Sequence, residues 1–302
     1  MTIFYIEHSI EYTYSQPVIF APHQLRLRPR SNVHQSVLSF DLAISPTPQQ
    51  VAESVDLDGN NSTLVWFENN LTTNLQIITK TTVSTNLINP FNYLLEPWAA
   101  NLPIDYPVSL SQQLQPYLTG YLGHSIDPIA AELAAEIWQT VDGKTIPFLS
   151  ELNQQIYHNC KYSIRDTGAS LPPGIVWKHR SGSCRDFVVL LLEVCRAVGL
   201  AGRFVSGYEA GAETDDRHLH AWAEIYLPGA GWRGYDPTHG LLVADNHIAL
   251  FSSPFPAQTT PVDGKLRTMG VITNQMKYRL VIDNSPDRFM EPTSHTGEGC
   301  HS

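Results

Sequence analysis

Residues 180–208 read RSGSCRDFVVLLLEVCRAVGLAGRFVSGY and join a helix pattern to a strand pattern. Apolar residues recur on one face of the predicted helix, at Phe187, Leu190, Leu191, Val194, Ala197 and Val198. Gly199 follows where a left-handed residue would end the helix, and the run RFVSGYEA after it is typical of a strand. The stretch therefore predicts a helix that begins near Cys184 and leads into a sheet.

Two more strands are expected downstream, HAWAEIYL at 220–227 and WRGYDPT at 232–238, joined by a Pro-Gly-Ala-Gly turn. If Tyr226 faces Trp232 across this turn, Asp236 lies diagonal to His220 on the same face of the hairpin. A register shifted by one residue would move Asp236 to the opposite face. The run QMKYRLVI, at 275–282, is the last predicted strand.

Upstream, the chain from about residue 4 to residue 88 reads as short strands separated by turn residues. Leu and Arg alternate over residues 25–28, and the Asp-Gly-Asn-Asn cluster at 58–61 separates two runs as a hairpin turn does. This pattern predicts an all-β, sandwich-like domain over residues 1–105.

A proline-punctuated junction follows, in which X-Pro pairs disfavour helix continuation as far as Pro116. Asp127 is then placed to cap a helix with Pro128 in its first position, and a second helix is expected around Phe148 and Ile156. The prediction is an α+β chain with a core domain over residues 106–285 and a flexible tail over residues 286–302.

Composition excludes several classes of protein. The chain has 302 residues, 42% hydrophobic and 16% charged, with a net charge of -10 and no basic stripe, so nucleic acid is not an expected partner. No run approaches the roughly 20 apolar residues of a membrane span, and no signal peptide pattern opens the chain, which predicts a cytoplasmic protein without membrane contact. Its four scattered cysteines predict reduced thiols.

Three residues form a candidate nucleophilic site. Cys184 falls where the predicted helix begins, so unpaired backbone amides and the helix dipole would favour a thiolate, and the small residues before it leave room for a carbonyl. A thiolate needs a histidine to protonate the leaving amine and a third group to orient that histidine, for which His220 and Asp236 are the candidates. Each of the three also has a purely structural interpretation. Cys184 is then a buried core residue, and Asp236 is a turn residue before proline. His220 is then a structural histidine of the strand, and His218 competes with it for the role of the catalytic base.

The blocks at 180–208 and HLHAWAEIYLPGAGWRGYDPTHG, with the Pro- and Gly-containing loop before them, resemble the core of bacterial transglutaminase-like proteins, which are often described as cysteine proteases. The resemblance covers roughly residues 145–265, and YIEHSIEYTYSQPVIFAPHQLRLRPR resembles the β-rich N-terminal domain of the bacterial members. It implies a papain-like or transglutaminase-like core in which a cysteine-bearing helix packs on an antiparallel sheet. It also implies a catalytic triad of Cys184, His220 and Asp236.

Other residues receive narrower predictions. The Cys184 backbone amide is expected to stabilise the oxyanion, with the Trp177 indole as a candidate second donor. Tyr208 and the acidic pair at 215–216 are candidates for shaping substrate choice, and Asp186 is expected to hold a neighbouring loop rather than to react.

The chain is therefore expected to act as a thiol peptidase or amidase on a protein or peptide substrate with an amide in its side chain or backbone. The alternatives are a transglutaminase, which transfers the acyl group to an amine, and a non-catalytic binding module. No cofactor and no metal are expected. The sequence leaves the oligomeric state open.

Overall fold

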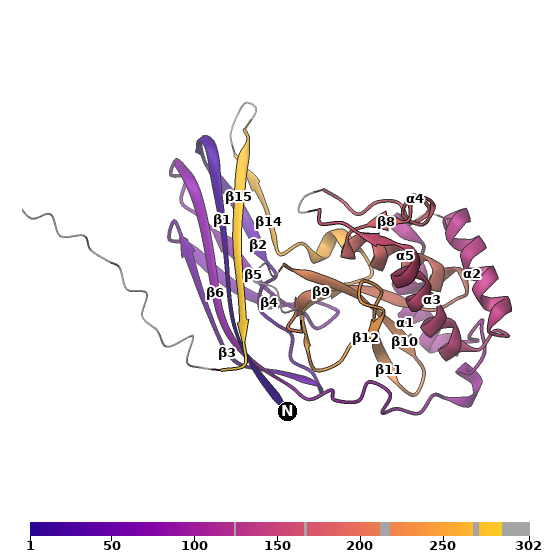
Figure 1. The fold of residues 1–302 in the computed structure, drawn as a ribbon. Helices are drawn as coiled ribbons and strands as arrows, with labels where there is room; N and C mark the ends of the chain where they lie inside the picture. Colours follow the sequence, from indigo (N-terminus) through magenta and orange to yellow (C-terminus); the bar gives the residue numbers. More distant parts are fainter. Residues whose placement is uncertain (124, 166–167, 212–217, 268–271, 286–302) are drawn as a thin grey trace, which may run out of the picture.

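The computed structural model describes residues 1–123, 125–165, 168–211, 218–267 and 272–285. A β sandwich stands beside a mixed core in which helices cover one side of a sheet (Figure 1). The predicted tail and the acidic pair at 215–216 lie outside the described residues. The predicted α+β fold class is confirmed. In the described part of the chain, no helix has the length and apolar character needed to cross a membrane.

Two four-stranded antiparallel sheets make up the sandwich. The first has the order β15-β1-β6-β3 and consists of β1 (Thr2–Val18), β3 (Gln35–Ser45), β6 (Thr72–Thr85) and β15 (Asn274–Asp283). The second has the order β14-β2-β5-β4 and consists of β2 (Phe20–Leu25), β4 (Gln50–Val55), β5 (Asn61–Trp66) and β14 (Val262–Leu266). The predicted turn at 58–61 joins β4 to β5, with Val55 opposite Asn61. The sandwich pattern read from the sequence is thus present.

The predicted end of the core domain is wrong for the last strands. β15 pairs with β1 from Tyr5 opposite Asp283 to Tyr14 opposite Asn274, and β14 pairs with β2. The C-terminal strands therefore complete both sheets of the N-terminal sandwich. Alternating apolar residues indicate that a segment is a strand, but they do not indicate which strand it pairs with. The partner of β15 is β1, more than 250 residues earlier in the chain.

The core sheet is antiparallel with the order β12-β11-β10-β9-β13. Its strands are β9 (Gly202–Glu209), β10 (His220–Leu227), β11 (Gly231–Asp236), β12 (Leu241–Leu242) and β13 (His247–Ser253). The helix α5 (Cys184–Ala197) packs on β9 and β10 through a cluster that includes Phe187, Leu191 and Ile225. Tyr226 lies opposite Trp232, so the predicted hairpin register is confirmed. Gly199 has the predicted left-handed conformation, with a φ of 78°.

The remaining helices surround α5. They are α1 (Val108–Leu118), α2 (Pro128–Thr140), α3 (Thr145–Asn159) and α4 (Pro173–His179). Three short 3-10 helices are η1 (Pro97–Ala99), η2 (Tyr121–Gly123) and η3 (Pro256–Thr259). Two short strands, β7 (Lys161–Tyr162) and β8 (Ser181–Gly182), pair with each other. Asp127 caps α2 as predicted, because its side chain accepts from the Ile129 amide. Helices α1 and α4 were not expected. Pro116 lies inside α1, two residues before its end, where its missing N–H leaves the Gln112 carbonyl without a helical donor, and Pro173 lies in the first turn of α4, where the missing N–H costs nothing.

Two carboxylates, one of them fully buried, fix the helices against one another. Glu193, fully buried on α5, accepts from the backbone amides of Tyr121 and Asp127 at 2.7 and 2.9 Å. Asp127 in turn accepts from the Gly174 amide of α4 at 3.1 Å. Because a buried carboxylate is stable only when its oxygens are hydrogen-bonded, these contacts hold α5 in one position relative to α2 and α4.

Side-chain amides attach the sandwich to the core. Asn60 donates to the Ser252 carbonyl at 2.7 Å and accepts from the Ser252 amide at 2.8 Å. Gln35 makes the same pair of bonds with Ala249, at 2.9 and 2.8 Å. Each side-chain amide supplies one donor and one acceptor to β13, which is an edge strand of its sheet. The sandwich thus provides hydrogen-bond partners for backbone groups of β13 that have no neighbouring strand on that side.

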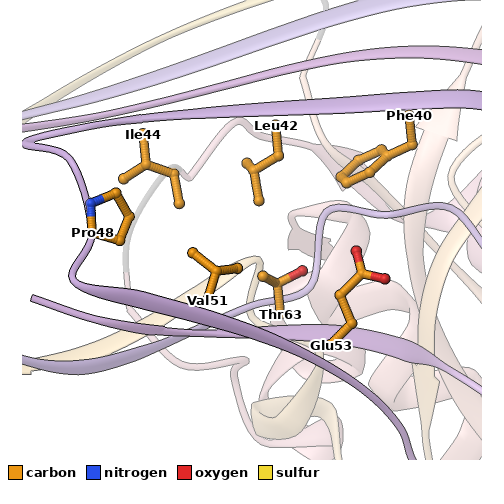
Figure 2. Close-up of a pocket in the computed structure, with 7 residues that line it drawn as sticks. All are labelled: Phe40, Leu42, Ile44, Pro48, Val51, Glu53 and Thr63. Atoms are coloured by element: carbon orange, nitrogen blue, oxygen red, sulfur yellow. The ribbon is translucent and has the colours of Figure 1, made fainter.

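A cavity of about 280 Å³ opens between the edge strands β3 and β4 of the sandwich. Figure 2 shows Phe40, Leu42 and Ile44 on one side facing Val51, Thr63 and Glu53 on the other, with Pro48 at one end. Glu53 is the ionisable residue of this lining, and it pairs with Arg28 at 3.0 Å. Since the lining contains neither a nucleophile nor a histidine, the candidate chemistry lies in the core.

Candidate active site

Cys184 is the first residue of α5 and lines a cavity of about 410 Å³ between the sandwich and the core. Its side chain is 8% exposed, so it contacts the cavity while most of its surface is covered. The first amides of a helix have no carbonyl partner within the helix, and they lie at its positive end. The fold thus places this sulfur where negative charge is stabilised and a carbonyl can approach.

His220 and Asp236 meet across the β10–β11 hairpin. His220 begins β10, Asp236 ends β11, and His220 Nε2 lies 2.7 Å from Asp236 Oδ2. The Cys184 side chain lies near enough to the imidazole to raise its pKa. Because Asp236 occupies Nε2, Nδ1 is the ring nitrogen left for the thiol. The structure therefore brings together the three residues predicted from the sequence.

Electrostatics favour an ion pair between His220 and Asp236. Burial lowers the pKa of His220, but the neighbouring Asp236 carboxylate and the contact with Cys184 raise it further, to a net pKa of about 10. Burial also opposes ionisation of Asp236, yet the hydrogen bonds and charge of His220 hold its pKa well below the usual range. At neutral pH the imidazole is protonated and the carboxylate ionised, as a proton donor to a leaving amine requires.

Two further histidines that the sequence analysis did not select bind the same carboxylate. His239 Nδ1 lies 2.9 Å and His247 Nε2 lies 3.2 Å from Asp236 Oδ2, while the Thr238 amide donates to Oδ1 at 2.9 Å. His239 follows Asp236 by three residues, so the string Asp-Pro-Thr-His contained a local signal. His247 lies on β13 at the other edge of the sheet, where no local pattern points to it.

The donor set could also attract a metal ion. Ligand atoms of His220, Asp236 and His247 lie within 4.8 Å of one another, the one such group within the described ranges. Nitrogen and carboxylate ligands suit zinc. The same Nε2 and Oδ2 atoms form the ion pair, however, so a bound metal would compete with it. We assign no metal here, and the predicted independence from metals and cofactors stays a prediction.

Asp186 holds the loop in front of the candidate nucleophile. Asp186 is structural as predicted, since it accepts from Arg165 at 2.5 Å, the Leu171 amide at 2.7 Å and the Ser183 amide and hydroxyl at 2.8 Å. It therefore fixes the loop and the residue in front of Cys184.

Trp177 and Tyr208 do not line the cavity in front of Cys184. Trp177 packs against the helical core, with the Arg180 guanidinium 3.4 Å from its ring centroid, so it is not placed as an oxyanion donor. Tyr208 is buried between β9 and the sandwich, and its hydroxyl lies 3.0 Å from His8 Nδ1. Tyr208 shares its face of β9 with Phe204 and Ser206, which line the cavity, but it lies farther along the strand, where the sandwich covers it.

His218 lies in the lining of the cavity but does not take the place of His220. Its ring meets Tyr278 of β15, with centroids 5.3 Å apart. The ring that contacts Asp236 from β10 belongs to His220, which resolves the competition between the two histidines in the sequence.

Comparison with known proteins agrees with this architecture. The family described as "Bacterial transglutaminase-like N-terminal region" matches residues 4–84, and the family described as "Transglutaminase-like superfamily" matches residues 131–237. The second range contains Cys184, His220 and Asp236. The resemblance predicted from the sequence is therefore confirmed in both parts of the chain.

Relatives and solved structures extend over different lengths. An uncharacterized protein of Mycobacterium tuberculosis is 29% identical over 287 residues, which cover 87% of each chain. A protein-glutamine gamma-glutamyltransferase of Pseudomonas aeruginosa is 29% identical over 124 residues, which cover 37% of this chain and 18% of that protein. The "Putative Cysteine Protease from Cytophaga hutchinsonii" superposes with a TM-score of 0.67 at 19% identity, over 93% of this chain and 90% of that one. This last likeness establishes the shared fold.

Proposed function

Because the chain joins a bacterial transglutaminase-like N-terminal region to a transglutaminase-like superfamily core, we propose that it is an amide-cleaving thiol enzyme that uses Cys184, His220 and Asp236. The observation that supports this most directly is the 2.7 Å contact between His220 Nε2 and Asp236 Oδ2, with Cys184 near enough to raise the pKa of the same imidazole. The substrate is a protein or peptide amide, and water is the usual acyl acceptor.

The first half of the reaction forms a thioester. Cys184 Sγ attacks the carbonyl carbon, and the displaced electron pair moves to the carbonyl oxygen. The tetrahedral intermediate then collapses, the C–N bond breaks, and the His220 imidazolium gives its proton to the leaving nitrogen. The raised pKa of His220 supports this order, because a proton is already on the ring when the amine departs.

The second half returns the enzyme to its starting state. Neutral His220 takes a proton from water as the water oxygen attacks the thioester, and the C–S bond then breaks to release an acid and the thiolate. In both halves the Cys184 amide, as the first N–H of α5, is the donor we assign to the oxyanion.

The test is the rate of alkylation of Cys184 by iodoacetamide between pH 6 and 9, located by mass spectrometry. Cys160 is an internal reference, since burial raises the pKa of its thiol to about 11. Fast reaction confined to Cys184, lost in His220→Ala and kept in the control His158→Ala on the exposed side of α3, is expected. Slow reaction that does not depend on His220 would instead indicate a binding module without catalysis.

Transfer to an amine is the second candidate, and the Pseudomonas aeruginosa glutamyltransferase relative favours it. The two outcomes differ in the acceptor that resolves the thioester. A glutamine-containing protein is incubated with the enzyme and a labelled primary amine. Release of ammonia or peptide without label supports hydrolysis, and incorporation of the label, absent in Cys184→Ala, supports transfer.

A further inference from the structure

The first sheet of the sandwich has one apolar face that two different neighbours cover. Near the start of β1, Phe4 and Ile6 pack against β13 of the core. Farther along the same face, Ile10 and Tyr14 pack against β2 and β5 of the second sheet. The strip between these coverings borders the cavity that contains Cys184. The cavity thus exists because the first sheet is longer than the core or the second sheet, each of which covers only part of its apolar face.

Aromatic side chains from the sandwich line this opening. Ile10 lies opposite Tyr278 and Tyr12 opposite Met276 in the pairing of β1 with β15, and all four residues border the cavity. The core contributes a further set of aromatic side chains to the same lining: Tyr121, Tyr162 and Phe204. A cavity of about 410 Å³ with walls of this kind has the size and lining of sites that bind apolar groups.

The charge of the lining differs from that of the chain. The net charge is -10, yet among the described residues the ionisable side chains that border the cavity are Arg165, Arg185, histidines, tyrosines and Cys184, and none of these is a carboxylate. Arg165 is paired with Asp186. The Arg185 guanidinium donates to the backbone carbonyls of Gly168 and Arg165, which are neutral acceptors, and no ion pair with a carboxylate is found for it within the described residues. A positively charged substrate group is therefore disfavoured, and a neutral or negative one is favoured.

We propose that the sandwich is one wall of the acyl-donor subsite and selects an aromatic side chain next to the amide that Cys184 attacks. Tyr12 and Tyr278 act as specificity-determining residues, and the occupant is an aromatic residue of a neutral or acidic peptide segment. This inference rests on the proposed function, because it assumes that Cys184 is the attacking atom. It gives the sandwich a direct role in substrate recognition.

The experiment compares two alkylating probes on each protein, iodoacetamide and N-benzyl-iodoacetamide. In both reactions the Sγ–CH₂ bond forms as iodide leaves, so only the benzyl group differs. The ratio of the two second-order rates at Cys184 reports the aromatic subsite and cancels changes in the thiol itself. Burial of the ring in the cavity is expected to give the wild type a ratio of about tenfold.

Matched variants assign the effect to the sandwich wall. Tyr12→Ala and Tyr278→Ala are expected to bring the ratio close to one, while Tyr12→Phe keeps it. Tyr5→Ala, on the opposite face of β1, also keeps it. A 4-carboxybenzyl probe should react at least as fast as the benzyl probe and a 4-aminomethylbenzyl probe more slowly. Circular dichroism melts establish that each variant is folded.

The possible failures are distinguishable. A ratio near one in the wild type, with fast iodoacetamide reaction that depends on His220, overturns the subsite and leaves the triad in place. A high ratio that persists in both alanine variants also overturns it. Slow reaction of both probes overturns the proposed nucleophile and the subsite with it.

Discussion

Two histidines face the same cavity from opposite walls and have opposite electrostatic states. His220, on the core wall, has a pKa raised to about 10 in spite of burial, because the Asp236 carboxylate lies 2.7 Å away. His8, on the sandwich wall, is equally covered, and burial lowers its pKa to about 4. Its hydrogen-bonding partner is the Tyr208 hydroxyl, and burial raises the pKa of that phenol. Burial therefore gives a neutral ring unless a carboxylate is buried with it.

The difference assigns separate tasks to the two walls. The core wall holds a proton that can be transferred, whereas the sandwich wall presents an uncharged ring among apolar side chains. An acyl donor would meet chemistry on one side and recognition on the other. Substitutions on either wall can remove the difference in protonation between His220 and His8 or measure its size.

The largest effect is expected from Asp236→Asn, which keeps the shape but removes the charge that distinguishes His220 from His8. The pKa of His220 should fall from about 10, since burial, its largest cause, is then opposed only by the contact with Cys184. Turnover and Cys184 alkylation should drop by about 1,000-fold. Histidine NMR titration and kinetics measure both, and an unchanged His220 titration would contradict the assignment of Asp236.

The same variant gives a prediction for stability against pH. A raised pKa in the folded state stabilises the protein fully below pH 6.5, and this contribution is lost as the pH rises through about 10. The unfolding free energy of the wild type should therefore fall more steeply between pH 6.5 and 10 than that of Asp236→Asn. Parallel curves in chemical denaturation would show that the ion pair is absent.

His8 should show the opposite slope. Its lowered pKa contributes stability above pH 6.5 that is lost as the pH falls through about 4, because only the unfolded chain takes up the proton in this range. At about 1.36 kcal/mol per pKa unit, the interval from 6.5 to about 4 corresponds to roughly 3 kcal/mol. His8→Phe should remove much of this acid sensitivity, measured by denaturant unfolding at pH 7 and pH 4.5. An identical loss in wild type and variant would place the acid-sensitive group elsewhere.

A smaller effect is expected from the two histidines that position Asp236. His247→Gln removes a buried contact and should lower turnover about tenfold, whereas His239→Gln, whose side chain is 42% exposed, should lower it by about threefold or less. Both should also move the alkaline limb of the pH profile, which a purely structural effect would leave in place. Equal effects from the two variants would contradict the difference in burial.

The smallest effect is expected from Trp177→Phe. The ring stacks with Arg180 outside the cavity, so phenylalanine keeps the packing and turnover should change by less than about twofold. A loss of tenfold or more would restore Trp177 as an oxyanion donor.

Local signals predicted much of the site. The apolar spacing after Cys184, the cap at Asp127 and the turn at 228–231 each depend on neighbouring residues, and the hairpin register followed from the Tyr226–Trp232 pair. The proline pattern of the junction does not predict α1, because Pro116 lies inside this helix and its apolar packing outweighs the lost hydrogen bond. The cytoplasmic location stays a prediction.

The sequence by itself determined which residues could form the triad, because a helix start and a tight hairpin are short-range structures that fix their own geometry. Tertiary structure alone decided that β15 returns to β1, that His247 joins Asp236, and that His8 and Tyr12 line the cavity that contains Cys184. These contacts join segments from distant parts of the chain, and their partners are chosen by burial of apolar surface and satisfaction of buried polar groups over the whole molecule. No local pattern records that choice.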